Sequence, residues 1–172
     1  MNLTELFSDK ALKAKERTAQ LSQWLSANPK KVDELIAFAQ TAKDPVKAAC
    51  IEAIEYVSKE NPKICTESCF NFVAANLAEE SPAVRREAGR VIGNVIALFP
   101  KHVEKVLTGL LNNAEDEGTV VRWSAAFALG EIIKLKTALN KDLVPVAEAI
   151  CEREEQASIQ KIYLAALKKA GH

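Results

Sequence analysis

Cys65 and Cys69 are the residues whose types and spacing come closest to a chemical site. They lie four positions apart, so on a helix both thiols would share one face and could together hold a metal ion. Further ligands are missing, because neither histidine of the chain, His102 or His172, is near them in sequence. Apolar residues take the matching positions of the neighbouring helices, which favours two buried thiols. We therefore expect no metal and no cofactor.

Motifs for catalysis are absent from the sequence. It contains no Gly-rich phosphate loop, no paired-Cys motif and no His-Glu-x-x-His, and neither histidine has a carboxylate or nucleophile at motif spacing. Cys50 and Cys151, like the first two cysteines, lie at apolar helical positions and are expected to be reduced. The sequence therefore predicts that the protein is not an enzyme.

Composition favours a helical protein without a strong overall charge. Of 172 residues, 48% are hydrophobic and only 6% aromatic, with six Gly and six Pro. Lys plus Arg equals Asp plus Glu at 23 each, so the whole molecule offers no attraction for nucleic acid or an anionic membrane. No apolar run has the length of a signal peptide or of a membrane span. We expect a single cytoplasmic domain.

The elements that would position any site come from an internal repeat. Three related stretches begin at Val46, Val84 and Val121, which are 38 and 37 residues apart, and a fainter fourth begins 38 residues later at Ile159. A period of this length indicates stacked helical units. Proline residues and capping residues mark the helix starts. The expected helices span residues 9–26, 29–42, 45–59, 62–78, 82–98, 100–112, 119–136, 141–154 and 156–170.

The second helix of each unit resembles that of HEAT repeats. An acidic residue is followed six positions later by Val-Arg, then by Ala-rich apolar positions and Leu-Gly, and Pro145 resembles the proline that the first helix of that family often carries. The resemblance implies an all-α fold, a right-handed α-α superhelix of the HEAT-like or armadillo-like solenoid type. It would hold about four helix pairs, in repeats at about 29–61, 62–99, 100–140 and 141–172, and residues 1–28 would form an N-terminal cap.

The resemblance also implies a ladder of charged residues between repeats. In this chain it maps to Glu79 with Arg85 and to Asp116 with Arg122. The outer units depart from the pattern, because Thr41 stands opposite Lys47 and Glu154 opposite Gln160. The ladder should therefore weaken at both ends. The helix at 9–26 would have no partner helix.

A helical wheel places the possible binding residues opposite the buried side of each second helix. In the third unit this side holds Trp123, Phe127, Gly130 and Lys134. The resemblance implies that second helices line the concave face, where the aligned side chains would lie next to one another. They comprise Ala48, Glu52, Glu55 and Lys59, then Arg86, Arg90, Gly93 and Ala97, then the four of the third unit, then Lys161, Ala165 and Lys168.

This face should therefore form a basic groove with an aromatic floor. Six of its residues are basic and only two acidic, and the acidic ones belong to one helix. Arg and Trp are enriched at binding hot spots. The candidate partner-binding residues are Arg86, Arg90, Trp123, Phe127 and Lys134. In the alternative interpretation the two aromatic residues only pack against adjacent helices, and Gly93 and Gly130 permit close helix approach.

Two functional classes are consistent with these residues. The first is a non-catalytic interaction module or scaffold that binds a protein or an acidic peptide on the concave face, as a monomer and without a membrane role. The second is a nucleic-acid-binding or DNA-repair protein, because some HEAT-like glycosylases use aromatic and acidic residues on a basic concave face, which Trp123, Arg86, Arg90 and Glu131 could mimic. The balanced charge argues against the second class. A subunit that holds a prosthetic group has no motif in this sequence.

Overall fold

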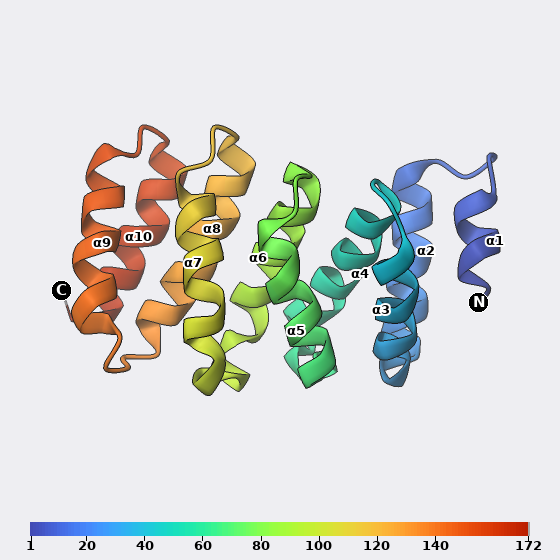
Figure 1. The fold of residues 1–172 in the computed structure, drawn as a ribbon, viewed down its shortest axis with the longest axis horizontal. Helices are drawn as coiled ribbons and strands as arrows, with labels where there is room; N and C mark the ends of the chain where they lie inside the picture. Colours follow the sequence, from blue (N-terminus) through green and yellow to red (C-terminus); the bar gives the residue numbers. More distant parts are fainter. Residues whose placement is uncertain (172) are drawn as a thin grey trace.

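The computed structural model describes residues 1–171 and contains no strand within them. Ten α-helices make up this part of the chain (Figure 1). Their bounds are α1 Leu3–Ser8, α2 Ala14–Ala27, α3 Val32–Thr41, α4 Val46–Glu60, α5 Glu67–Ala75, α6 Pro82–Val95, α7 Val103–Ala114, α8 Thr119–Lys134, α9 Asn140–Arg153 and α10 Ala157–Ala170. Short 3-10 turns cover Pro29–Lys31, Pro62–Ile64, Asn76–Ala78, Ile96–Leu98 and Pro100–His102. The all-α superhelical repeat fold that the sequence predicts is confirmed.

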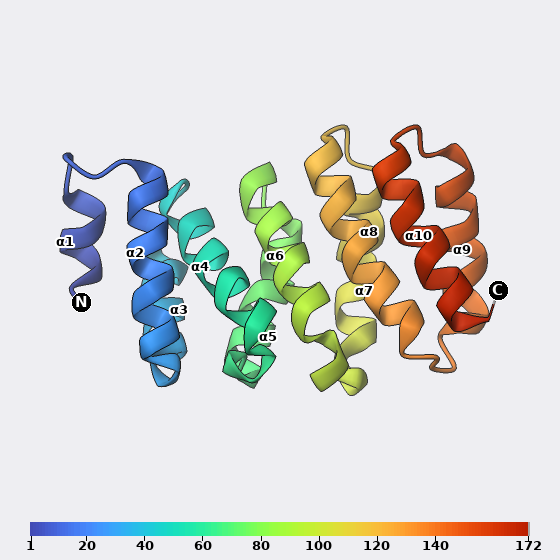
Figure 2. The same ribbon diagram turned by 180° about the vertical axis from the view of Figure 1, so that it is seen from behind.

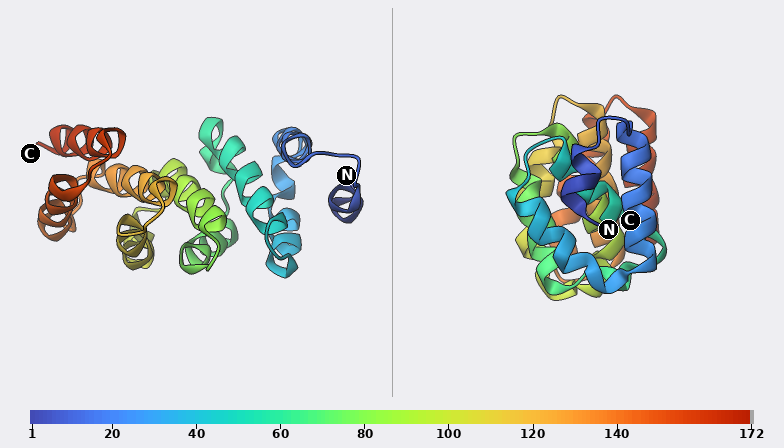
Figure 3. Two further views of the ribbon diagram at one scale, coloured as in Figure 1. Left: turned by 90° about the horizontal axis from the view of Figure 1, so that it is seen from above. Right: turned by 90° about the vertical axis from the view of Figure 1, so that its right-hand side faces the viewer.

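The helices form two layers along one elongated stack. Even-numbered helices lie side by side in one layer and odd-numbered helices in the other, with the two termini at opposite ends (Figures 1 and 2). Packing is closest between successive even helices, from α4 to α6, α6 to α8 and α8 to α10. Seen from above, the row of even helices bends, with its middle deeper than its ends (Figure 3, left). We call the surface of this row the even-helix face.

Local capping explains why the helices begin where they do. The hydroxyl of Thr66 accepts the backbone N–H of Cys69 at 3.1 Å, and that of Ser81 accepts the N–H of Val84 at 3.4 Å. Each bond satisfies a donor that the first turn of a helix leaves free. Pro82 follows as the first residue of α6, where its missing N–H removes no helical bond.

The N-terminal region differs from the prediction of one helix over residues 9–26. A short helix, α1, precedes α2, and the turn between them is held by Arg17, which donates to the carbonyls of Leu6, Asp9 and Leu12. Phe7 stacks on Phe38 of α3 with ring centroids 5.6 Å apart. Arg17 thus ties α1 to α2, while α2 itself packs chiefly on α4. The wheel missed α1 because a six-residue helix shows less than two turns of periodicity.

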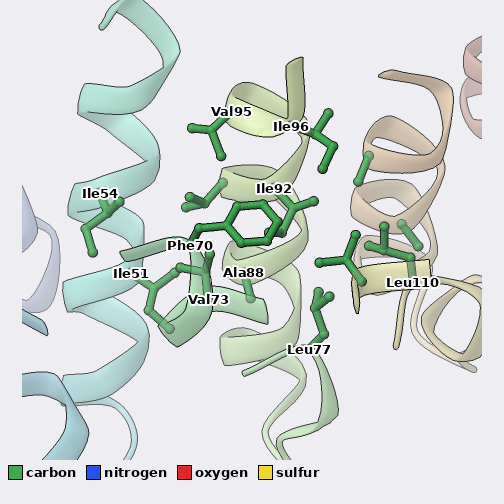
Figure 4. Close-up of a cluster of buried hydrophobic side chains, with 14 of the residues drawn as sticks. Ile51, Ile54, Phe70, Val73, Leu77, Ala88, Ile92, Val95, Ile96 and Leu110 are labelled. Atoms are coloured by element: carbon green, nitrogen blue, oxygen red, sulfur yellow. The ribbon is translucent and has the colours of Figure 1, made fainter. Parts of the chain in front are cut away.

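One continuous hydrophobic core runs between the two layers. In Figure 4, Phe70 of α5 lies beside Ile92 of α6, with Ile51 of α4 on one side and Leu110 of α7 on the other. All four of these side chains are fully buried. Each helix pair thus shares its core with its neighbours, as expected for repeats that cannot bury their apolar faces alone.

The four cysteines are free and buried in this core. Burial raises the pKa of the Cys50 thiol to about 12, and the pKa of Cys69 is raised by its hydrogen bond with Cys65 and by burial. Thiols that stay protonated are poor ligands and poor nucleophiles. Within residues 1–171, no group of three or more His, Cys, Asp or Glu side chains is arranged to hold a metal ion, and no helix is long and apolar enough to cross a membrane.

Candidate interaction surface on the even-helix face

Two adjoining hollows lie at the centre of the even-helix face, and we refer to them together as the central groove. The larger, of about 710 Å³, is walled by α2 and α4 and reaches Arg90 of α6. The smaller, of about 360 Å³, lies between α4, α6 and α8. Glu52 and Arg90 line both hollows, so the two are continuous. A chain laid across them would contact four successive even-numbered helices, α2, α4, α6 and α8.

Each hollow of the central groove has an exposed aromatic side chain in its lining. Tyr56 of α4 lines the larger hollow and is 61% exposed, while Trp123 of α8 lines the smaller one and is 38% exposed. Large aromatic rings that remain in contact with water offer an apolar surface to a partner. The sequence predicts Trp123 as an aromatic contact for a partner. It does not predict Tyr56, which lies one helical turn after Glu52.

Phe127 supports Trp123 from below. The two rings stack with centroids 5.8 Å apart and planes inclined by 25°. Phe127 is half-buried because it packs over Gly93 of α6, where an added Cβ would lie only 2.3 Å from the ring. Gly93 and Gly130 were expected on the exposed stripe, but both are buried between adjacent even helices. Part of the predicted exposed stripe is therefore a contact between helices. This agrees with the alternative interpretation, in which the two glycines permit close helix approach.

The expected basic groove is wrong, because its two arginines are already paired. Arg86 contacts Glu87 at 2.6 Å, and Arg90 contacts Glu87 at 3.1 Å and Glu55 at 2.9 Å. Glu87 is fully buried beneath them. The wheel left Glu87 out because its Cα lies about 100° from that of Arg86. Three carboxylates, counting Glu52, here surround two guanidinium groups.

Glu52 is the carboxylate of this cluster that remains available. Among residues 1–171 it forms no ion pair, although Arg86 and Arg90 line the same hollow. Burial raises the pKa of Glu52, and the charge of Glu87 raises it further against the opposing effect of the arginines. Burial likewise raises the pKa of Glu55, against the opposing charge of Arg90. Glu52 is therefore a partly desolvated carboxylate that has no ion-pair partner among residues 1–171.

Of the other basic residues of the predicted stripe, only Lys59 lines the central groove. Lys134 pairs with Glu131 one turn earlier on α8, and neither lines the two hollows. Lys161 and Lys168 of α10 are exposed farther along the stack. Of the five candidate partner-binding residues, the structure brings Arg86, Arg90 and Trp123 to one hollow, places Phe127 beneath it and leaves Lys134 outside.

A charged ladder links the units, but its partners differ from those expected. Each basic residue reaches the acidic residue of the next unit and not the one six positions before it. The pairs are Lys47 with Glu79 at 2.5 Å, Arg85 with Asp116 at 2.7 Å, and Arg122 with Glu154 at 2.9 Å. The predicted pairing of Glu79 with Arg85 and of Asp116 with Arg122 is therefore wrong.

Contacts inside a unit involve the backbone. Arg122 donates to the carbonyl oxygens of Asp116 and Glu117 at 2.9 and 3.0 Å, and Gln160 donates to that of Glu154 at 2.6 Å. Hydrogen bonds from Arg122 lower the pKa of Glu154. The outer units, where the ladder was expected to weaken, contribute Lys47 and Glu154 to it. Glu154, which has no basic residue six positions after it, thus forms its ion pair with Arg122 of the preceding unit.

Comparisons with known proteins identify the architecture. No family model matches the chain, and no curated protein matches its sequence. Among solved structures, it is similar to a designed armadillo repeat protein in complex with the peptide (KR)4, with a TM-score of 0.75 and 19% identity over 98% of this chain and 80% of the other. Computationally designed armadillo repeat proteins for modular peptide recognition give a TM-score of 0.71 at 19% identity, covering 97% and 80%.

A third similar structure is an engineered protein solved as a structural-genomics target. It has a TM-score of 0.73 at 16% identity and covers 98% of this chain and 79% of its own. Agreement over nearly the whole chain at such low identity shows a shared fold. This chain therefore has the architecture of an armadillo-like helical repeat.

Proposed function

We propose that the even-helix face binds an extended peptide segment of a protein partner, with a lysine or arginine of that segment beside Glu52. The observation that carries the proposal is a carboxylate that forms no ion pair among residues 1–171 and lines both hollows of one groove, together with an exposed aromatic ring in each hollow. The protein would act as an interaction module or scaffold, without catalysis.

The charge of the groove determines which peptide fits. The acidic peptide that the sequence predicts requires Arg86 and Arg90 to be free, yet both already contact buried carboxylates. A cationic side chain would instead find Glu52, a carboxylate without an ion pair among the described residues, whose pKa is raised first by burial and then by the charge of Glu87. Trp123 and Tyr56 could cover its aliphatic stem, and aromatic faces also attract cations.

A similar scaffold supports this choice of ligand. The designed armadillo repeat protein that shares the fold is described in complex with (KR)4. Solenoids in general bind partners on extended surfaces formed by aligned repeats. Nucleic-acid binding has less support, because Arg86 and Arg90 are already paired and the acidic side chains that line the groove equal the basic ones in number, whereas phosphate recognition needs an excess of cationic groups.

The test is a fluorescence titration of labelled (KR)4 and of a charge-reversed peptide, (ED)4, with the wild type, Glu52→Gln and Trp123→Ala. We expect binding of (KR)4 only, weakened about tenfold or more in Glu52→Gln, as for a lost hydrogen bond to a charged group. Trp123→Ala should weaken it while the melting temperature stays nearly unchanged. Glu104→Gln, on the exposed surface of α7, is the matched control and should bind as the wild type does.

Acidification gives a second readout from the same titration. Because the pKa of Glu52 is raised, its protonation and the loss of (KR)4 binding should begin at a higher pH than for an ordinary glutamate. Glu52→Gln should remove most of that pH dependence. Equal binding of both peptides, or an unchanged affinity in Glu52→Gln, would refute the proposal. Salt-dependent binding of random duplex DNA in place of (KR)4 would favour the nucleic-acid class.

A further inference from the structure

We infer that the outer face of the last helix pair, α9 and α10, is a contact surface for a second copy of this chain. A hollow of about 900 Å³ lies between the two helices on the side away from α7 and α8. Its wall on α9 is formed by Glu148, Cys151 and Glu152, and its wall on α10 by Gln160, Leu164, Leu167 and Lys168. Within residues 1–171, no helix packs on this side.

The α10 wall departs from the inner units at two aligned positions. Where α6 and α8 have Gly89 and Ala126, α10 has Leu164, and where they have Gly93 and Gly130, α10 has Lys168. The small residues of the inner units are buried against the next even helix: a Cβ at Gly89 would lie 2.9 Å from the Ser124 hydroxyl. A helix stacked in the same way on α10 would collide with two large side chains.

Leu164 is consequently left as an apolar projection beside a hollow. Its side chain is 57% exposed, while Leu167 and Cys151 at the bottom of the hollow are 6% and 8% exposed. Exposed apolar residues beside a concave apolar surface mark interaction sites. A partner that fills this hollow must therefore insert an apolar side chain of its own.

The charges around the hollow complement those of the same face in another copy. Glu148 and Glu152 line it on α9, and Lys168 lines it on α10. A two-fold axis running between the helices would set α9 of one copy against α10 of the other, because such an interface uses the same patch twice. Leu164 of each copy would then enter the hollow of the other, with Lys168 facing the opposite carboxylates. This arrangement departs from the monomer expected from the sequence.

Sedimentation equilibrium over a range of protein concentrations tests this pairing. The wild type should change from 18.8 kDa towards twice that mass as the concentration rises. Leu164→Asp should remain a monomer with unaltered circular dichroism. Leu98→Asp is the matched control, since Leu98 is 47% exposed but lies outside the hollow, and it should pair as the wild type does.

Exchanging the charges of Lys168 and of the two glutamates on α9 tests the proposed two-fold arrangement. Lys168→Glu should weaken pairing, and adding Glu148→Lys and Glu152→Lys to it should restore pairing. A wild type that stays monomeric up to several hundred micromolar would overturn the inference, as would a Leu164→Asp variant that still pairs. Failure of rescue by charge exchange, with Leu164 still required, would overturn the two-fold arrangement. None of these outcomes depends on peptide binding at the central groove.

Discussion

Gly93 shows how one residue shapes the candidate binding surface. With no Cβ, it lets the Phe127 ring lie directly on α6, and Trp123 stacks on that ring at the edge of the central groove. Gly130 is its counterpart one repeat later, but there a Cβ would be 3.3 Å from Ala166, a contact that small shifts can relieve. Glycine is thus required by packing at position 93, whereas position 130 has nearly enough room for a Cβ atom.

Replacing each glycine by alanine should separate these demands. Gly93→Ala should lower the free energy of unfolding by about 1 to 3 kcal/mol, as overpacking does, because the Phe127 ring must move. Gly130→Ala should be close to neutral or slightly stabilising, since alanine is favoured over glycine in a helix by about 1 kcal/mol. Urea denaturation of both variants measures the difference. Equal effects would contradict the packing of Phe127 on Gly93.

At the scale of the element, the charged ladder sets the register between neighbouring helix pairs. Arg85 belongs to the second helix of one unit, and Asp116 lies just before the second helix of the next. Asp116 also accepts the backbone N–H of Gly118 at 2.8 Å, which holds the turn that leads into α8. The Asp116 carboxylate therefore has two roles: it holds the turn before α8 and it binds Arg85 of the preceding unit.

A double-mutant cycle on Arg85→Ala and Asp116→Ala should reveal this link. Both side chains are about four-fifths buried, and we expect a coupling free energy of about 1 kcal/mol, at or above the range for exposed pairs. The control cycle joins Arg85→Ala with Glu79→Ala, the partner expected from sequence alone, and should be additive. If the control cycle showed coupling and the cycle of Arg85 with Asp116 were additive, the pairing of Glu79 with Arg85 predicted from the sequence would be correct.

At the scale of the whole molecule, stability depends on the core shared along the stack. Leu129 of α8 is fully buried, and α8 packs on α6, α7, α9 and α10. In a solenoid, stability is approximately the sum of the units and the interfaces between neighbours. A cavity at this junction should therefore weaken several interfaces at once.

Leu129→Ala should destabilise the protein by about 2 to 5 kcal/mol, the usual cost of truncating a buried leucine. Leu98→Ala, at an exposed position, should change the free energy of unfolding by about 0.5 kcal/mol or less. Thermal and urea unfolding followed by circular dichroism measure both values. A cost below about 1 kcal/mol for Leu129→Ala would mean that the repeat register is wrong.

The sequence by itself determined the helices and their faces. The spacing of 37 and 38 residues identified the repeat, and i, i+4 periodicity separated buried residues such as Leu129 from exposed ones such as Trp123. Both properties are local, because a helix fixes the direction of each side chain relative to its own axis. The short helix α1 escaped detection because periodicity needs more than one or two turns.

Only the tertiary structure decided which charged groups meet. Arg85 could reach an acidic residue of its own unit or of the next, and the spacing along the chain does not distinguish the two. Glu87 lies beneath Arg86 and Arg90 where α4 and α6 pack closely, and these ion pairs change the predicted basic groove into one lined by as many acidic as basic side chains. Ion pairs depend on how one unit is superposed on the next, since side-chain charges interact over a few ångströms and those distances are set between helices.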